Sequence, residues 1–333
     1  MADDTRYAYA VARVRGMETR LLDRQWIERL LSESAEGALK ALADSAYQDA
    51  VADVDTPEAI EAGLEKAMSE MLTTIAAIAP DPELIDLFRE RFDYSNLKSF
   101  LKASLLKVDS NGTGVVDGPG TIPAATLEAA VRDKDYTMLP GFLADAARDA
   151  EEAYRDQGEL SIVDHTLDSS LWEHSLRTAE ASSSEFLADY FRTEVDLINI
   201  KTFMRMKAMN SDQSDLARAF IPGGSLDLSF FRSALGETID AFARSIEYGK
   251  YGVLTEALVE SSPEKRYALE LACDNVLIGF VDRAKMTAYG IEPLIAFILH
   301  RTIEMKLVRT AIVAKLDGVE RSDVEERLRM IHV

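Results

Sequence analysis

The sequence predicts an all-α protein, and three observations support this class. Apolar residues recur at intervals of three and four, which is the spacing of one face of an α-helix. Only 17 glycines and 9 prolines interrupt the 333 residues, so few positions force the chain out of a helix. The alternation of apolar and β-branched residues that marks a half-buried strand is nearly absent, and residues 113–116 are the closest match to it.

The clearest helical periodicities lie in three parts of the chain. They are carried by Leu21, Leu22, Trp26 and Leu30, by Ile85, Phe88, Phe92, Leu97 and Leu101, and by Phe186, Leu187, Tyr190 and Phe191. Asp23, Asp168 and Asp274 each precede an apolar run, where an acidic side chain can accept backbone N–H bonds, so we expect each to begin a helix. Pro57, after Thr56, is expected in a first helical turn.

Glycine-rich turns divide the chain into segments of similar length. The strongest turn signals lie at residues 111–114, 117–120 and 221–224. Gly16 and Gly318 each follow basic residues, and we expect both to end helices, because glycine tolerates the left-handed cap conformation and cations suit the carboxyl end of a helix.

A short motif occurs three times in the chain. It reads acidic-x-x-(Asn or Leu)-aliphatic-basic-(Ser or Thr), and its copies are residues 93–99, 196–202 and 304–310. The acids of successive copies are 103 and 108 residues apart, and five residues before each acid a large apolar residue is followed by Arg or His. Self-similarity at a fixed period indicates a structural repeat.

The repeat predicts three helical domains of roughly a hundred residues each. Their predicted bounds are 17–120, 121–225 and 226–333, and a helix over residues 5–15 would pack near the point where the third repeat closes. Because the first and last helices look like parts of one interrupted unit, we expect the three units to pack around a pseudo-threefold axis.

The polar residues of the motif form the candidate site. They are Asp93, Asn96 and Lys98 in the first copy, Asp196, Asn199 and Lys201 in the second, and Glu304 and Arg309 in the third, where Leu307 replaces Asn. An acid and an Asn three residues apart share a helix face and can hydrogen-bond, whereas the base points elsewhere and is expected to pair with a neighbouring helix or unit. One interpretation is a polar ring that lines a central cavity. The other, which we favour, is a set of buried polar pairs that fix helix register.

Charge and composition exclude several classes of partner. The chain has 58 acidic and 37 basic residues, which gives a formal net charge of −21. This charge repels phosphate backbones and anionic headgroups, so we expect no direct binding to nucleic acid or lipid.

The single cysteine, Cys273, rules out an intramolecular disulfide and fits a reducing compartment. The apolar stretches are shorter than the ~20 residues that span a bilayer, and the first residues lack a secretory pattern. We therefore expect a cytoplasmic protein that reaches a membrane only through partners.

The sequence predicts no catalytic, cofactor-binding or metal-binding residues. Its glycine-rich turns lack the lysine of a phosphate-binding loop, and its four histidines have no zinc-site spacing. Met204, Met206 and Met209 beside Phe203 are interpreted as a core stripe, with an adaptable binding surface as the alternative. Two further functional classes stay open, namely a helical enzyme that uses acidic side chains around a divalent cation and an open helical scaffold for soluble partners.

Several segments resemble one known family. They are residues 7–16 (YAYAVARVRG), the motif copies 93–98 and 196–201, the turn 220–226 (FIPGGSL) and residues 290–297 (GIEPLIAF). In order and spacing they resemble the C subunit of the archaeal and bacterial V/A-type rotary ATP synthases and ATPases, a relative of the d subunit of the eukaryotic V-ATPase. The resemblance covers essentially the whole chain, and Leu307 is its one clear departure within the motif.

The resemblance implies an all-α, funnel-shaped protein of three similar domains, with no catalytic role and no cofactor. Such a protein would sit between the rotary shaft, made of the D and F subunits, and the membrane ring of c/K/L-type proteolipids, on the cytoplasmic face of the membrane. It would transmit torque between ATP synthesis or hydrolysis and proton or sodium transport. We expect the shaft to contact helix ends and loops near the axis, around Gly120, Gly223 and Gly224.

Overall fold

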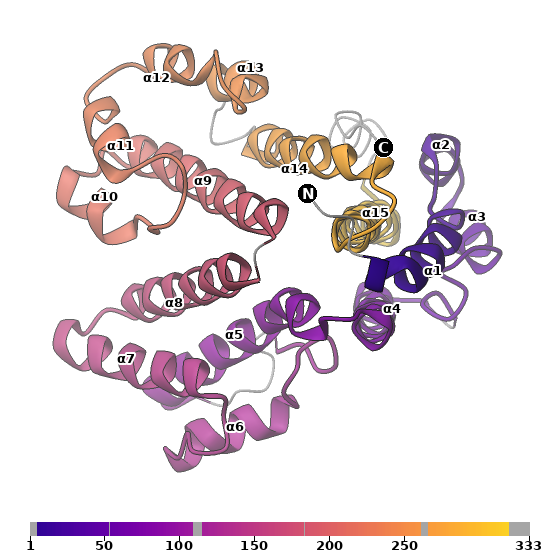
Figure 1. Ribbon diagram of the computed structural model, residues 1–333, viewed down its shortest axis with the longest axis horizontal. Coiled ribbons are helices and arrows are strands. Elements are labelled where there is room, and N and C mark those ends of the chain that lie inside the picture. The colour runs from indigo at the N-terminus through magenta and orange to yellow at the C-terminus, as the bar shows by residue number, and fades with distance from the viewer. Residues whose placement is uncertain (1–4, 53, 109–114, 183, 261–265, 320–333) are drawn as a thin grey trace. The chain divides into compact units, whose positions relative to one another are not determined.

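The computed structural model describes residues 5–52, 54–108, 115–182, 184–260 and 266–319, and each regular element in these ranges is a helix (Figure 1). The prediction of an all-α protein is confirmed. Residues 115 and 116, the described half of the strand candidate, form no strand. The turn predicted at 111–114 and the last residues of the third predicted domain, 320–333, lie outside the described residues.

The described residues fall into two compact units. Unit 1 is drawn from Met1–Pro82 and Ile239–Val333, and unit 2 from Glu83–Thr238. Unit 2 holds the first two motif copies and unit 1 holds the third. The division of the sequence into three repeats remains a prediction.

Unit 1 is built around one long helix, α15 (Glu292–Leu316). Its other elements are η1 (Thr5–Tyr7), α1 (Ala8–Glu18), α2 (Arg24–Ser32), α3 (Ala35–Ala43), α4 (Pro57–Ile78), α12 (Ile239–Ile246), η2 (Gly252–Leu254), α13 (Thr255–Val259), α14 (Arg266–Asp282) and η3 (Arg283–Met286). Helices α1, α2, α3, α4 and α14 all pack on α15, so the earliest and latest described helices of the chain are neighbours (Figure 1). The core between them includes Leu30, Tyr47, Ile60 and Val308, none of which is exposed. Full burial of one such apolar side chain contributes about 1.5–3 kcal/mol to folding.

The described part of unit 2 consists of seven helices. They are α5 (Pro82–Leu106), α6 (Ala124–Asp133), α7 (Gly141–Gln157), α8 (Leu160–Ala181), α9 (Glu185–Ala208), α10 (Gln213–Ala219) and α11 (Leu228–Ala234). Helix α8 packs between α7 and α9, as Figure 1 shows. Leu143, Leu167 and Val195, one from each of these helices, are completely buried.

Three of the predicted helix ends, at Asp23, Pro57 and Gly318, are confirmed. The Asp23 side chain accepts a bond from the backbone N–H of Trp26 and begins α2, and Thr56 begins α4 with Pro57 in its first turn. Gly318 follows α15 with a φ of 69°, in the left-handed region expected of a helix-ending glycine. Gly16 does not end the first helix, which begins as a 3-10 turn at Thr5 and continues as α1 to Glu18. The prediction of a helix over residues 5–15 was therefore too short, because a single glycine can be accommodated inside a helix at a cost of only about 1 kcal/mol.

Candidate functional site

The acids of the three motif copies occupy equivalent places in the three longest described helices. Asp93 lies in the middle of α5, Asp196 in the middle of α9 and Glu304 in the middle of α15. Their exposed fractions are 1%, 0% and 4%, respectively. A buried carboxylate is costly unless polar groups bind it, so the partners of each acid indicate what it does.

Asp93 binds the connection between α5 and α6. Its carboxylate accepts bonds from the backbone N–H of Thr121 at 3.0 Å, from the hydroxyl of Thr121 at 2.6 Å and from the N–H of Ile122 at 3.1 Å. One turn later, the amide of Asn96 bonds to both backbone groups of Val116, donating at 2.7 Å and accepting at 2.9 Å. The acid and the amide thus fix two points of one loop to α5.

Asp196 binds the connection between α10 and α11 in the same way. Its carboxylate accepts bonds from the backbone N–H of Ser225 at 3.0 Å and of Leu226 at 2.8 Å. The Asn199 amide donates to the carbonyl of Ile221 at 2.7 Å and accepts from its N–H at 2.9 Å. We call each such acid, together with the backbone N–H groups that it binds, a carboxylate anchor.

The glycines predicted for the interface loops are required by these anchors. A Cβ atom on Gly120 would lie 2.2 Å from Oδ1 of Asp93, and one on Gly224 would lie 2.2 Å from Oδ1 of Asp196. Any other residue would therefore push the loop away from its carboxylate. Gly223 adopts a φ of 106°, which side-chain-bearing residues rarely adopt.

The third anchor is made by Glu304 with a distant part of the chain. Its carboxylate accepts bonds from the backbone N–H of Leu22 at 2.5 Å and from the hydroxyl of Tyr47 at 2.7 Å, and it pairs with Arg301. The guanidinium of Arg301 also lies 4.0 Å from the centre of the Tyr47 ring. Leu307, which takes the place of the motif Asn, is buried and apolar. Glu304 therefore has a charged partner where the other two anchors have an Asn neighbour.

The three anchored backbone groups stand at matching positions. Leu22, Ile122 and Leu226 each lie two residues before the first residue of the next helix, α2, α6 or α11. In each case the buried acid thereby fixes the point where a new helix begins. Asp93 and Asp196 each bind a loop that comes later in the chain. The loop that Glu304 of α15 binds is instead the segment between α1 and α2, which comes earlier in the chain.

Burial sets the ionisation of these groups. It raises the pKa of Asp93, and the hydrogen bonds from Thr121 and Ile122 offset part of that effect. It also raises the pKa of Glu304, against the opposing charge of Arg301. The pKa of Tyr47 is raised well above its usual value by burial and by the neighbouring Glu304 charge. Burial thus favours the neutral form of each group, and the hydrogen bonds or charges around the two acids oppose that effect.

The motif bases of the first and third copies pair with other helices. Lys98 donates to Asp168 of α8 at 2.7 Å, and Arg309 donates to Glu61 of α4 at 2.7 Å. Both pairs are half-exposed, so each contributes about 0–1 kcal/mol. Lys201 of the second copy is exposed on α9.

Two predicted helix starts are wrong. Asp168 lies inside α8 and Asp274 inside α14, and neither caps a helix. Instead each pairs with a lysine, Asp168 with Lys98 and Asp274 with Lys306 at 2.5 Å. A pattern of one acid before an apolar run does not distinguish a cap from a surface position, since both suit an acid.

Sequence reasoning missed a pair of charges that joins α5 to α9. The guanidinium of Arg91 donates to Glu194 at 2.9 Å through one nitrogen and makes a second, shorter contact through the other. Four aromatic rings surround this guanidinium, those of Phe88, Trp172, Tyr190 and Phe191. Arg91 and Glu194 each stand two residues before a motif acid, but the third copy has Thr302 there, so the shared position was the only sequence signal for the pair.

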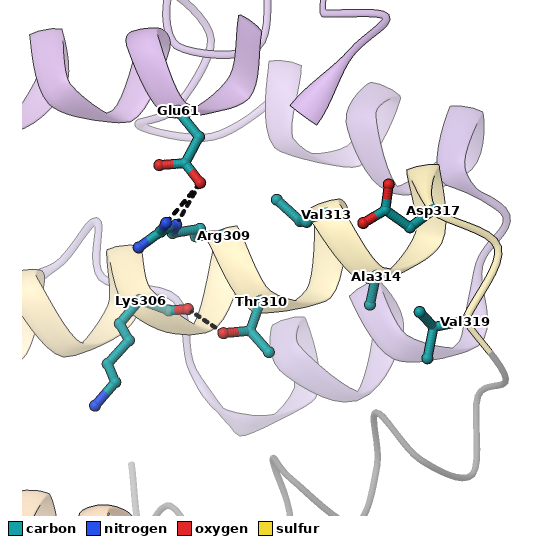
Figure 2. A pocket seen from close by; sticks show the side chains of 8 residues that line it. All are labelled: Glu61, Lys306, Arg309, Thr310, Val313, Ala314, Asp317 and Val319. Atoms are coloured by element: carbon teal, nitrogen blue, oxygen red, sulfur yellow. Dashed lines mark hydrogen bonds and ion pairs between the residues drawn. The ribbon is translucent and has the colours of Figure 1, made fainter. Parts of the chain in front are cut away.

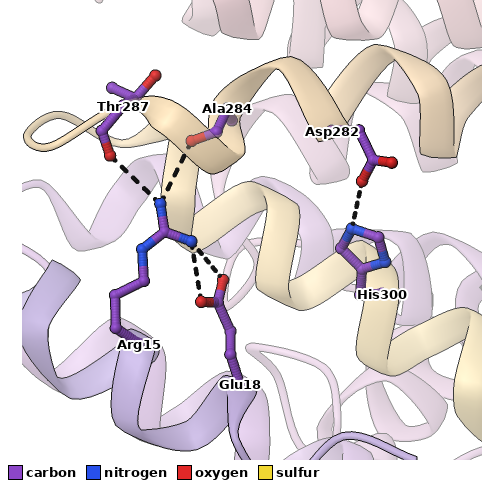
Figure 3. Close-up of polar contacts among 6 residues, drawn as sticks. All are labelled: Arg15, Glu18, Asp282, Ala284, Thr287 and His300. Carbon is purple, nitrogen blue, oxygen red and sulfur yellow. Dashed lines mark hydrogen bonds and ion pairs between the residues drawn. The ribbon is translucent and has the colours of Figure 1, made fainter. Parts of the chain in front are cut away.

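The connection between α14 and α15 is also held by side chains of other elements. Figure 3 shows Arg15 of α1 reaching this connection, where it donates to the carbonyls of Ala284 at 3.4 Å and Thr287 at 3.3 Å. Nε2 of His300, the base before the third motif, lies 3.0 Å from a carboxylate oxygen of Asp282. Helix α1 thus holds this connection through the Arg15 side chain.

Within the described ranges, no three His, Cys, Asp or Glu side chains come together as metal ligands would. No described helix is long and apolar enough to cross a membrane. The buried acids of the candidate site accept bonds from backbone, hydroxyl or guanidinium groups of the same unit. Their geometry positions loops and helix starts.

Fold and site together define an all-α protein in which a recurring carboxylate anchor fixes the connections of three long helices. The model of the ATP synthase (C/AC39) subunit family matches residues 10–327. The chain therefore belongs to this family, and the resemblance noted from the sequence is confirmed.

Relatives of known name are similar over nearly their whole length. The C subunit of the V-type sodium ATPase of Enterococcus hirae is 22% identical over 96% of this chain and 97% of its own. The C subunit of the A-type ATP synthase of Methanothermobacter thermautotrophicus is 27% identical over 97% of this chain and 87% of its own. That of Methanocaldococcus jannaschii is 25% identical over 97% and 86%.

Proposed function

We propose that this chain is the non-catalytic C subunit of a V/A-type ATP synthase or ATPase, located in the central stalk. It joins the D–F shaft to the proteolipid ring and transmits the torque that couples ATP turnover to proton or sodium transport. It is held at the cytoplasmic face of the membrane by these partners. Membership of the C/AC39 family over residues 10–327 supports the place in the complex.

The carboxylate anchors are the observation that carries the torque role. An adaptor between two rotating parts loses work if its contact loops yield, so these loops must be stiff. Asp93 and Asp196 each bind two backbone N–H groups of a loop beside Gly120 or Gly224, which removes the freedom that a surface loop ordinarily has. The packing of α1 against α15 also supports this proposal over an open scaffold, whose first and last repeats are predicted to stay apart.

A binding experiment with two baits tests the proposal. The purified chain is offered to the reconstituted D–F pair and to detergent-solubilised proteolipid rings at physiological salt. We expect capture by both baits, and a bridged complex of shaft and ring only when the chain is added. Capture by neither bait would show that the proposal is wrong.

A variant tests the assignment of the shaft to the loops. Ser225 is exposed and its backbone N–H is anchored by Asp196, so Ser225→Arg changes loop charge without removing the anchor. We expect weaker capture of the D–F pair. The matched control is Ser233→Arg, on the exposed face of α11, where the hydroxyl bonds only to carbonyls of its own helix. Equal capture of the shaft by both variants would place the shaft elsewhere.

A further inference from the structure

Unit 2 contains a groove of about 850 Å³ between α8, α9 and α10. Its α9 side is formed by Ile198, Thr202, Arg205, Met206, Met209 and, just after the helix, Ser211. The volume falls within the range of about 300–1,000 Å³ that is usual for ligand sites. The groove lies beyond the Asp196 anchor, in the half of α9 that leads to α10.

Unit 1 contains a smaller groove, of about 330 Å³, at the same register of its own long helix (Figure 2). Its lining includes Glu61 of α4, Arg309 and, along α15 and just after it, Lys306, Thr310, Val313, Ala314, Asp317 and Val319. In both units the groove is formed by the residues that follow the motif acid by 2, 6, 9, 10, 13 and 15 positions. The hollow thus recurs after the second and third motif copies, and the side chains that fill these positions give each groove its own chemistry.

The unit 2 groove exposes apolar side chains along one helical stripe. Ile198 and Met206 are half-buried and Met209 is 68% exposed. The methionines were interpreted from sequence as core, and this holds for Met204, which is buried beside Phe203, whereas Met206 and Met209 face the groove. Methionine is flexible and polarisable, so it adapts to an apolar partner surface.

The same groove contains a cation that forms no ion pair among the described residues of its unit. Most charges of its lining are paired, Lys98 with Asp168, Arg218 with Asp215, and the acid Asp164 with Lys102. Glu159 lies close enough to Arg218 for its charge to raise the pKa of that group, together with the larger effect of Asp215. Within the part of the chain that the structure describes, Arg205 is in no ion pair, and it stands in the apolar stripe between Thr202 and Met209.

We propose that the unit 2 groove binds an amphipathic helix of a partner chain, one that presents apolar side chains to Met206 and Met209 and a carboxylate to Arg205. An arginine bound to a carboxylate in a partly desolvated groove makes a strong charge-assisted hydrogen bond, and the apolar stripe receives the other face of such a helix. The inference does not depend on the proposed function, because it names the chemistry of the partner and not its place in a complex.

The unit 1 groove does not fit the same partner. Its cations are already neutralised, Lys306 by Asp274 and Arg309 by Glu61, and its remaining charge is the acid Asp317. Val313 and Ala314 replace the long side chains of Arg205 and Met206. The two grooves therefore differ in that, among the described residues, the unit 2 lining contains a cation outside any ion pair and the unit 1 lining does not.

A peptide experiment on the full-length chain tests the proposal without shaft or ring. The probe is a fluorescent amphipathic peptide of about four helical turns, with leucines on one face and glutamates beside them. Its twin carries glutamine for each glutamate. We expect saturable binding of the acidic peptide and about tenfold weaker binding of the twin, since one charge-assisted bond is lost.

Variants locate the site. Arg205→Gln should weaken the acidic peptide about tenfold while leaving the glutamine twin unchanged. The matched control is Arg232→Gln, an exposed arginine of the same unit on α11, which should leave both peptides unchanged. Peroxide oxidation gives a second readout, in which the acidic peptide should protect Met209 and leave Met138, which is 79% exposed, fully reactive.

Four outcomes would overturn the proposal. They are equal affinity for the two peptides, an equal loss in Arg205→Gln and Arg232→Gln, no protection of Met209, and no saturable binding. Because neither bait of the pull-down is present, the peptide result stands whether or not the chain bridges a shaft and a ring.

Discussion

The anchors of unit 2 and the anchor of unit 1 make the same backbone contact at very different distances along the chain. Asp93 and Asp196 hold N–H groups 28–30 residues further on, whereas Glu304 holds the N–H of Leu22, 282 residues earlier. The first two contacts close short loops, while the third ties the last described helix to the beginning of the chain. A buried carboxylate can thus keep one geometry when the chain connectivity around it changes.

The two kinds of anchor also differ in how the negative charge is balanced. In unit 2 the carboxylates rely on backbone N–H groups and, for Asp93, the Thr121 hydroxyl. In unit 1 the longer Glu304 side chain lies between Arg301 and Tyr47, so part of its stabilisation comes from a buried ion pair. We therefore expect the unit 1 anchor to be the more sensitive to removal of its acid.

The largest effect is expected from Glu304→Ala. Removal of this carboxylate leaves the Arg301 charge and the Tyr47 hydroxyl buried without their acceptor, which should lower the free energy of unfolding by about 3–5 kcal/mol. Urea denaturation followed by circular dichroism measures this loss. Glu70→Ala, which removes one partner of the exposed pair with Lys66, should cost about 0–1 kcal/mol. Similar losses in the two variants would contradict a stabilising role for the Glu304 network.

A smaller and local effect is expected from Asp196→Ala. Two backbone N–H groups, those of Ser225 and Leu226, lose their acceptor, at a cost of roughly 1–3 kcal/mol. Hydrogen exchange with mass spectrometry should show faster exchange in residues 221–226. Residues 115–122, which Asp93 and Asn96 hold, serve as the internal control. Unchanged exchange at 221–226 would show that the anchor does not limit loop motion.

Two glycine substitutions distinguish a glycine that must be small because a carboxylate lies against it from a glycine with open space around it. Gly224→Ala places a Cβ atom 2.2 Å from the Asp196 carboxylate and should destabilise the protein by about 1–3 kcal/mol. Gly16→Ala lies inside α1 with open space around the new atom, so it should stabilise the protein by roughly 0.5–1 kcal/mol. Thermal unfolding of both variants gives the signs, and two shifts in the same direction would refute the distinction.

Much of the fold was predictable because helical periodicity is a local property of the sequence. The motif likewise located Asp93, Asp196 and Glu304 at one register of three helices, since repeats preserve spacing. The backbone N–H donors that these acids bind could not be derived in this way. That Glu304 would bind Leu22 depends on how α1 and α15 pack, and no pattern within either segment specifies a partner 282 residues away.

The cations show the same limit at the level of single residues. Lys98 and Arg309 pair with neighbouring helices, as the motif spacing suggested, but the choice of Asp168 and Glu61 as partners follows from helix packing. Asp168 was expected to cap a helix and instead lies within α8. Sequence thus identified Lys98 and Arg309 as residues that pair with other helices but missed Arg91 and Glu194, and tertiary structure determined the partner of each.

The smallest expected effect is a pH dependence that distinguishes the unit 1 anchor. Burial raises the pKa of Glu304 above its ordinary value of 4.5, although Arg301 opposes the shift. The native state then holds this proton more tightly than the unfolded state does. The contribution of this proton to stability is therefore full below pH 4.5 and is lost as pH rises through the folded pKa.

The variant Glu304→Gln removes this titration while keeping the side-chain shape. The unfolding free energy of the wild type minus that of Glu304→Gln should therefore increase as the pH falls from about 7 to about 5, measured by urea denaturation at each pH. Asp93, whose pKa is also raised by burial, is present in both proteins and cancels from the difference. A constant difference would mean that Arg301 fully offsets the effect of burial on Glu304, and a decreasing difference would mean that Arg301 outweighs it.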